Sequence, residues 1–160
     1  MSFRDFEDAK LEPWTASGTS GESKWQVVTT GEATSGVGAL YYGNVKYKNF
    51  NDGANSGTAT SQPIAIPANG KTKLQFNLWM DTEISDTYDL LTVQVAGATV
   101  WTKALQKTLK MKTWQTWTVD LSGYAGKTVQ LAFAFSAGDA TDNSGEGVYV
   151  DDVAVIKACP

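Results

Sequence analysis

The feature that most constrains the fold is a two-residue alternation of apolar and polar side chains, repeated in short segments. In residues 73–80 every second side chain is apolar, ending with Leu78 and Met80, while Trp79 falls on the opposite face. This period places one face of a β-strand on a core and the other toward solvent. The same pattern occurs in residues 91–95, 116–121, 129–135 and 148–156. The chain is therefore expected to be built from half-buried strands.

Clusters of Gly, Ser, Asn and Pro separate these segments and are typical of turns, as in residues 17–21, 51–57 and 67–70. Weaker strand candidates are residues 3–8, 12–15, 25–29, 39–43, 58–61 and 100–104. Residues 103–112 have helix-forming composition but are short and uncapped, so we interpret them as a strand end and loop. The pattern predicts one all-β module over residues 1–160, an antiparallel β-sandwich (jelly roll) of about 8–11 strands without substantial helix.

Composition and charge argue against nucleic acid and membranes as partners. The net charge is -4 and no basic run occurs, so neither nucleic acid nor an anionic membrane is an expected partner. No apolar stretch approaches the ~20 residues of a membrane span, and the first residues lack the apolar core of a signal peptide. Cys159 has no second cysteine to pair with. We expect a module cut from a longer secreted or cell-surface protein.

Catalysis is not expected from this sequence. The chain has no histidine, the usual general base of serine and cysteine hydrolases, and no Gly-x-Ser-x-Gly motif. Paired carboxylates could in principle hydrolyse a glycoside, and the pair to test is Glu83 with Asp89 or Glu146. No apolar sequence surrounds Glu83 and Asp89 to raise the pKa that a general acid needs. A glycoside hydrolase is the less favoured alternative.

Acidic residues near both chain ends suggest a cation site. Alternation places Asp151 on the same side as Tyr149, Val153 and Val155, so its carboxylate points toward packing and needs a partner. The first and last strands of a sandwich commonly lie close together, which would bring Glu7 near it. Calcium, which takes six to eight oxygen ligands, would suit them. Alternatively, Glu7 is solvated and Asp151 accepts backbone hydrogen bonds.

Several short motifs follow one another in a particular order. They include Phe6-Glu7-Asp8, Ala39-Leu40-Tyr41-Tyr42-Gly43-Asn44, Val119-Asp120-Leu121-Ser122 and Gly147-Val148-Tyr149-Val150-Asp151-Asp152-Val153. In this order the chain resembles the MAM-like and galactose-binding-like jelly-roll modules attached to secreted bacterial enzymes and surface proteins. The resemblance implies a structural Ca²⁺ held by Glu7 and Asp151, with Asp8, Asp52 and Asp152 as further candidate ligands. The paired cysteines of animal MAM domains are absent.

A second acidic group lies on two predicted loops. It comprises Glu83 and Asp89 before one strand, and Asp139, Asp142, Asn143 and Glu146 before the last strand. These side chains offer enough oxygens for a cation, although the spacing is not that of an EF-hand. The alternative interpretation is a solvated loop closed by Asx turns.

Aromatic residues suggest a carbohydrate as the ligand, because the apolar face of a sugar ring packs on aromatic rings. Trp79, Trp101 and Trp114 are predicted on an open sheet face, with Tyr42 beside them. Core packing is the alternative for each ring. The sequence thus predicts a non-catalytic, calcium-stabilised extracellular accessory module that binds glycans or a surface. The alternative is an interaction domain that docks a neighbouring domain or self-assembles.

Overall fold

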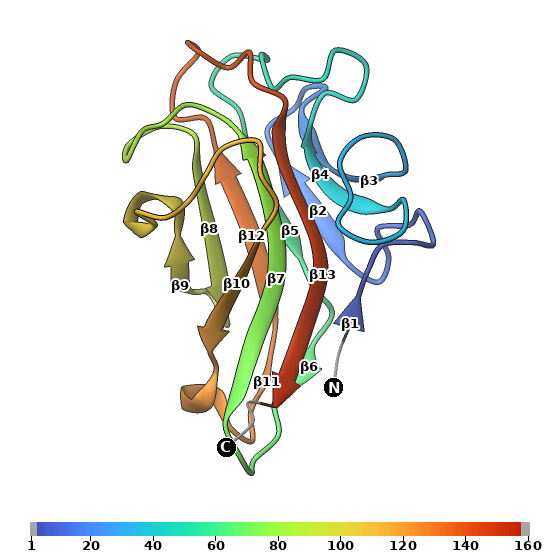
Figure 1. Ribbon diagram of the computed structural model, residues 1–160, viewed down its shortest axis with the longest axis vertical. Coiled ribbons are helices and arrows are strands. Elements are labelled where there is room, and N and C mark those ends of the chain that lie inside the picture. The colour runs from blue at the N-terminus through green and yellow to red at the C-terminus, as the bar shows by residue number, and fades with distance from the viewer. Residues whose placement is uncertain (1–2, 158–160) are drawn as a thin grey trace.

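The computed structural model describes residues 3–157, and within them two antiparallel sheets face each other (Figure 1). One sheet contains, in spatial order, β10 (Gln115–Asp120), β7 (Thr72–Asp81), β13 (Gly147–Lys157), β4 (Ala39–Gly43) and β3 (Lys24–Val28), and β1 (Phe3–Arg4) also pairs with β13. The other contains β2 (Thr15–Gly18), β5 (Ser56–Thr60), β12 (Leu131–Ser136), β8 (Leu90–Val95) and β9 (Ala98–Thr102). The predicted β-sandwich is confirmed.

Four short elements complete the described fold. A ribbon of β6 (Ile64–Ala65) and β11 (Thr128–Val129) lies outside the two large sheets, and two 3-10 turns are η1 (Lys103–Leu105) and η2 (Ser122–Tyr124). None of the helical segments in residues 3–157 has the length and apolar character needed to cross a membrane. Cys159 lies outside the described residues.

The core lies between the two sheets and consists of the alternating side chains expected from the sequence. Leu74, Phe76 and Leu78 of β7 are fully buried, as are Leu131 and Phe133 of β12. Phe133 lies with its ring centroid 5.3 Å from that of Phe76 on the opposite sheet. The two-residue period therefore predicted the inward faces of β7 and β12 correctly.

The N-terminal strands differ from the prediction. Residues 39–43 match β4, but β1 ends at Arg4, because Phe6 has a φ of +59° and the Ala9 amide donates to the Phe6 carbonyl in a turn. The predicted strand 12–15 is wrong, since β2 begins only at Thr15. Residues 103–112 start with η1 and continue as loop.

A β-bulge in β13 overturns one side-chain assignment. The register with β7 shifts between Asp151 and Ala154, and Asp152 has a φ of +50°. Before the bulge Tyr149 and Asp151 face away from the main core, whereas Val153 and Val155 after it face into the core. The expectation that all four share one face is therefore wrong, because the extra residue of a bulge inverts the alternation. Asp151 is nevertheless fully buried.

Candidate functional site

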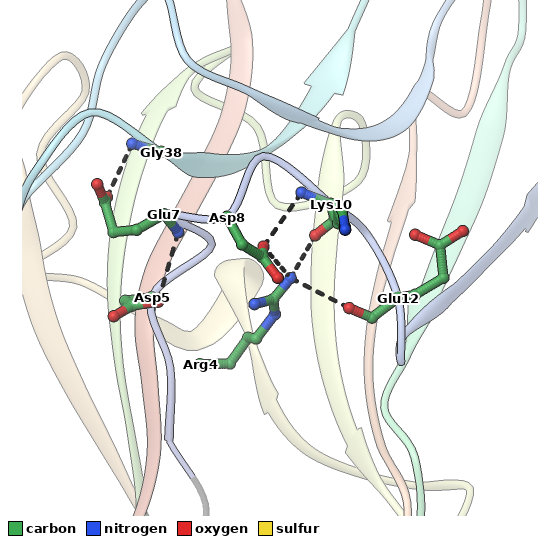
Figure 2. Close-up of polar contacts among 7 residues, drawn as sticks. All are labelled: Arg4, Asp5, Glu7, Asp8, Lys10, Glu12 and Gly38. Carbon is green, nitrogen blue, oxygen red and sulfur yellow. Dashed lines mark hydrogen bonds and ion pairs between the residues drawn. The ribbon is translucent and has the colours of Figure 1, made fainter.

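Three carboxylates from near the two ends of the chain hold the loop of residues 29–38, which joins β3 to β4. Glu7, in the turn after β1, accepts a hydrogen bond from the Gly38 amide at 2.8 Å (Figure 2). Its carboxylate also accepts one from the Val37 amide at 3.0 Å. Most residues of this loop are exposed. The Glu7 carboxylate therefore anchors the C-terminal end of the loop.

Asp151 and Asp152 anchor the middle of the same loop. The Asp151 carboxylate accepts hydrogen bonds from the Thr34 and Ser35 amides at 2.9 and 3.2 Å and from the Asp152 amide at 2.7 Å. Burial raises the pKa of Asp151, and the three amide bonds act in the opposite direction. Asp152 accepts hydrogen bonds from the Ser35 hydroxyl and from Asn77 of β7. The bulge turns both neighbouring carboxylates toward the loop.

Of the five predicted calcium ligands, the structure brings three to the 29–38 loop and leaves two elsewhere. Glu7, Asp151 and Asp152 contact the loop and form no ion pair with a lysine or arginine among residues 3–157. Asp8 instead pairs with Arg4 at 2.8 Å, which lowers the pKa of its carboxyl (Figure 2). Asp52 accepts a hydrogen bond from the Ser23 amide. Within the described chain no group of three acidic side chains is gathered as a metal cage would require.

A buried lysine binds the loop that carries Glu83 and Asp89 of the second predicted acidic group. Lys103 is only 5% exposed, and its Nζ donates to the carbonyl oxygens of Glu83, Tyr88 and Asp89. The Asp89 carboxylate accepts a hydrogen bond from the Glu83 amide at 2.8 Å, and burial raises its pKa to about 6. Burial also lowers the pKa of Lys103. Three carbonyls that could have faced a metal are therefore already bonded to a side-chain cation.

The second half of that group has separate partners. Buried Asn143 donates to the carbonyls of Gly53 and Asp139, and Glu146 accepts a hydrogen bond from the Tyr149 hydroxyl at 2.7 Å. Asp142 lies in a turn with a φ of +56°. Asn143 and Glu146 therefore have separate partners, and the structure places no shared contact among all six residues of the group.

The aromatic residues proposed as a sugar platform are largely covered. Trp101 and Tyr42 belong to the main core, so the prediction that they lie on an open face is wrong. Trp79 does face the other side of its sheet, but it is packed 5.4 Å from Tyr149 in a second cluster that half-buried Trp114 also contacts. The position of each of these rings is set by packing against rings distant in sequence, and a local sequence pattern carries no information about such contacts.

The open face of the five-stranded sheet carries small neutral side chains that sequence reasoning did not single out. From central β12, Ala132, Ala134 and Ser136 point outward, opposite the buried Leu131, Phe133 and Phe135. The register places them in three rows across β5, β12 and β8, namely Thr60-Ala132-Gln94, Thr58-Ala134-Thr92 and Ser56-Ser136-Leu90. The only sequence signal was that these alanines alternate with buried phenylalanines.

Two hollows lie on this face and share Thr58. One of about 530 Å³ extends from Thr58 and Ala132 toward β6 and β11, and the other of about 410 Å³ extends from Ala134 toward Gly18 of β2. No charged residue lines either hollow within the described chain. Thr58, Thr60 and Gln94 form no side-chain hydrogen bond in residues 3–157, so their polar atoms remain available to a ligand.

No known family model matches the chain. Among curated proteins, Bacillopeptidase F of Bacillus subtilis (strain 168) is 33% identical over 150 residues, which make up 94% of this chain and 10% of that protein. The chain thus spans about a tenth of the length of its relative.

Solved structures share the fold at lower sequence identity. A CBM61 module in complex with β-1,4-galactotriose matches with a TM-score of 0.64 and 16% identity, covering 96% of this chain and 94% of that one. The K3 cleaved adhesin domain of Lys-gingipain from Porphyromonas gingivalis matches with a TM-score of 0.63 and 17% identity, covering 98% of both chains. The chain has the β-sandwich fold of these modules. The more specific resemblance to MAM domains stays a prediction.

Proposed function

We propose that this chain is a non-catalytic accessory module that binds a glycan on the open face of its five-stranded sheet. The observation that carries the proposal is the hollowed face lined by hydroxyl, amide and methyl groups without charge. Hydroxyl and amide groups can exchange hydrogen bonds with sugar hydroxyls, and methyl groups pack on their C–H surfaces. A fold shared with a carbohydrate-binding module supports the same function.

The carboxylates considered for glycoside hydrolysis are unsuited to it. Asp89 is 1% exposed and is bonded to the Glu83 amide, so a substrate could not reach it without opening the loop. Glu146 is bonded to Tyr149 and pairs with Lys48 at 3.6 Å. These contacts support binding without catalysis. The match to about a tenth of a peptidase supports the proposal that this module is one part of a larger extracellular protein.

Affinity electrophoresis in gels containing soluble polysaccharides tests the function. At least one neutral polysaccharide should retard the protein, and Ala134→Ile, which fills the centre of the open face, should remove the retardation. Thr118→Ile is the matched control, because Thr118 is exposed on β10 of the other sheet. Unretarded migration of the wild-type protein across neutral and acidic polysaccharides would exclude glycan binding.

We also propose that Ca²⁺ binds where Glu7 and Asp151 meet the 29–38 loop, with carbonyl oxygens of the loop completing the ligands. Three carboxylates without a basic partner support this site. Binding to the folded state alone should raise stability by about 2.7 kcal/mol at one hundred times the dissociation constant. Thermal unfolding in calcium and in chelator measures this shift. It should vanish in Glu7→Gln and Asp151→Asn but persist in Asp52→Asn, and identical curves for the wild-type protein would exclude the site.

Docking to a neighbouring domain or to a second copy is the second candidate function. Ile84 and Leu105 are 87% and 74% exposed, and Ile84 lines a small pocket together with Leu109 and Met111. An exposed apolar side chain beside a partly apolar pocket favours an interface. Sedimentation velocity over a range of concentrations tests self-assembly, which Ile84→Asp should weaken. A concentration-independent monomer would leave only the neighbouring domain, to be tested by the same measurement on a longer chain.

A further inference from the structure

The central strand of the open face forms a trough between two walls. Its floor consists of the outward side chains of β12, which are Ala132, Ala134 and Ser136. Larger side chains flank most of it, with Thr58 and Thr60 on β5 and Thr92 and Gln94 on β8. Neighbouring strands lie about 4.8 Å apart, so the walls stand close on both sides of the floor. β12 lies between β5 and β8 in the rear layer of Figure 1.

The trough follows the strand and does not cross it. Ala132 and Ser136 are four residues apart, which is about 13 Å along a strand. A ligand lying along β12 would contact all three rows, whereas a ligand lying across the strands would pass over Thr58 and Thr92 and contact one row. The two hollows extend this path at both ends, toward β11 and toward β2.

The side chains also define the chemistry of the ligand. Without a charged residue in either hollow, a charged ligand would lose hydration and gain no ionic partner. Of the described residues that line the two hollows, Phe135 is the one aromatic residue, and its ring belongs to the core. Affinity must then come from many weak hydroxyl and methyl contacts along an extended ligand. A side branch in the plane of the sheet would meet the threonine walls.

We propose that the open face takes a neutral, unbranched oligosaccharide chain lying along β12, with its contacts distributed over the three rows. This inference rests on the proposed glycan-binding function and adds the charge, shape and direction of the ligand. The wall residues Thr58, Thr60 and Gln94, whose side-chain polar atoms have no partner in residues 3–157, bind its hydroxyl groups.

The test uses calorimetric titration with unbranched β-1,4-linked oligomers of glucose, xylose, galactose and N-acetylglucosamine, each from two to six units. Oligogalacturonides of the same lengths serve as the charged comparison. The protein variants are Ala132→Ile, Ala134→Ile and Ser136→Ile, one for each row. Isoleucine is well accepted in strands and fills the trough without adding a polar group. Thr118→Ile is again the control, and circular dichroism verifies the fold of each variant.

We expect affinity for a neutral oligomer to increase with length until the chain spans three rows, and each trough variant to weaken it at least tenfold. The control variant should bind like the wild-type protein, and oligogalacturonides should bind at least tenfold more weakly. Sensitivity to one row alone, or equal binding of the charged oligomers, would overturn this inference and leave glycan binding intact. If the wild-type protein binds none of the oligomers but is retarded by a polysaccharide, this inference is overturned and glycan binding stands. If no polysaccharide retards it either, the proposed function fails as well.

Discussion

Burial of Asp89 makes the stability of the fold depend on pH in a specific direction. The pKa of this carboxyl is about 6 in the folded chain, compared with 3.8 for an unperturbed aspartate, so the folded state holds the proton more tightly. Stability from this group is therefore full below pH 4 and is lost as pH rises to about 6. The difference is about 3 kcal/mol, since each pKa unit corresponds to 1.36 kcal/mol.

Urea unfolding of the wild-type protein and Asp89→Asn between pH 4 and pH 7 measures this effect. The other acids titrate in both proteins and cancel in the comparison. The stability of the wild-type protein relative to the variant should increase as pH falls. Parallel curves would show that Asp89 has an ordinary pKa.

Lys103 of η1 holds the same loop through its buried ammonium group. Lys103→Met keeps an apolar stem but leaves the carbonyls of Glu83, Tyr88 and Asp89 without their donor. Removing one partner of a buried charged contact costs about 3 kcal/mol or more. Equilibrium unfolding at pH 7 checks this value. Lys107→Met is the control and should change stability by less than about 0.5 kcal/mol, because that side chain is 79% exposed. Equal effects of the two substitutions would contradict the burial of Lys103.

The 29–38 loop is an element whose order depends on side chains from other elements. The Oδ2 oxygen of Asp151 accepts from both the Thr34 and Ser35 amides, and its Oδ1 oxygen accepts from the Asp152 amide. Asp151→Asn removes the negative charge that strengthens these bonds and places an amide group against N–H donors. A hydrogen bond to a charged group contributes about 1.5–3 kcal/mol, so the Thr34 and Ser35 amides should exchange with solvent at least tenfold faster in chelator. Hydrogen exchange resolved by residue measures this. Asp152→Asn should leave both amides protected, because Asp152 contacts the Ser35 hydroxyl and not its amide. Unchanged protection in Asp151→Asn would refute the anchor.

Strands with a regular apolar–polar alternation were predictable from the sequence, whereas interruptions of that alternation were not. The alternation in residues 73–80 and 129–135 correctly separated Phe76 and Phe133 from the outward side chains, because period two is a local property. The bulge at Asp152 has no such local signal, so Tyr149 and Val153 were placed on one face. The trough could not be predicted from the sequence either, because its walls come from pairing β12 with strands distant in sequence. Lys103 fell at a predicted strand end, and its buried ammonium was not predicted because its carbonyl partners lie 14 to 20 residues away in the sequence.

At the scale of the whole molecule, the two proposed sites lie on different sheets. The 29–38 loop joins β3 to β4 and is anchored by β13, all of the first sheet, whereas the trough belongs to β5, β12 and β8 of the second. A cation at the loop and a glycan in the trough would therefore share no ligand residue. The core between the sheets is what connects them, and its packing decides whether they form one cooperative unit.

Phe133 is the residue through which that cooperativity is best tested. Its ring lies 5.3 Å from Phe76 of the opposite sheet and stacks 6.0 Å from Trp14, which precedes β2. Phe133→Ala removes contacts to both sheets and should cost about 3–5 kcal/mol. Because the cavity destabilises both sheets together, urea midpoints from far-ultraviolet circular dichroism and from tryptophan fluorescence should fall by the same amount. Separate midpoints would show that one sheet unfolds before the other, and the sandwich would then not transmit stability from the anchored loop to the open face.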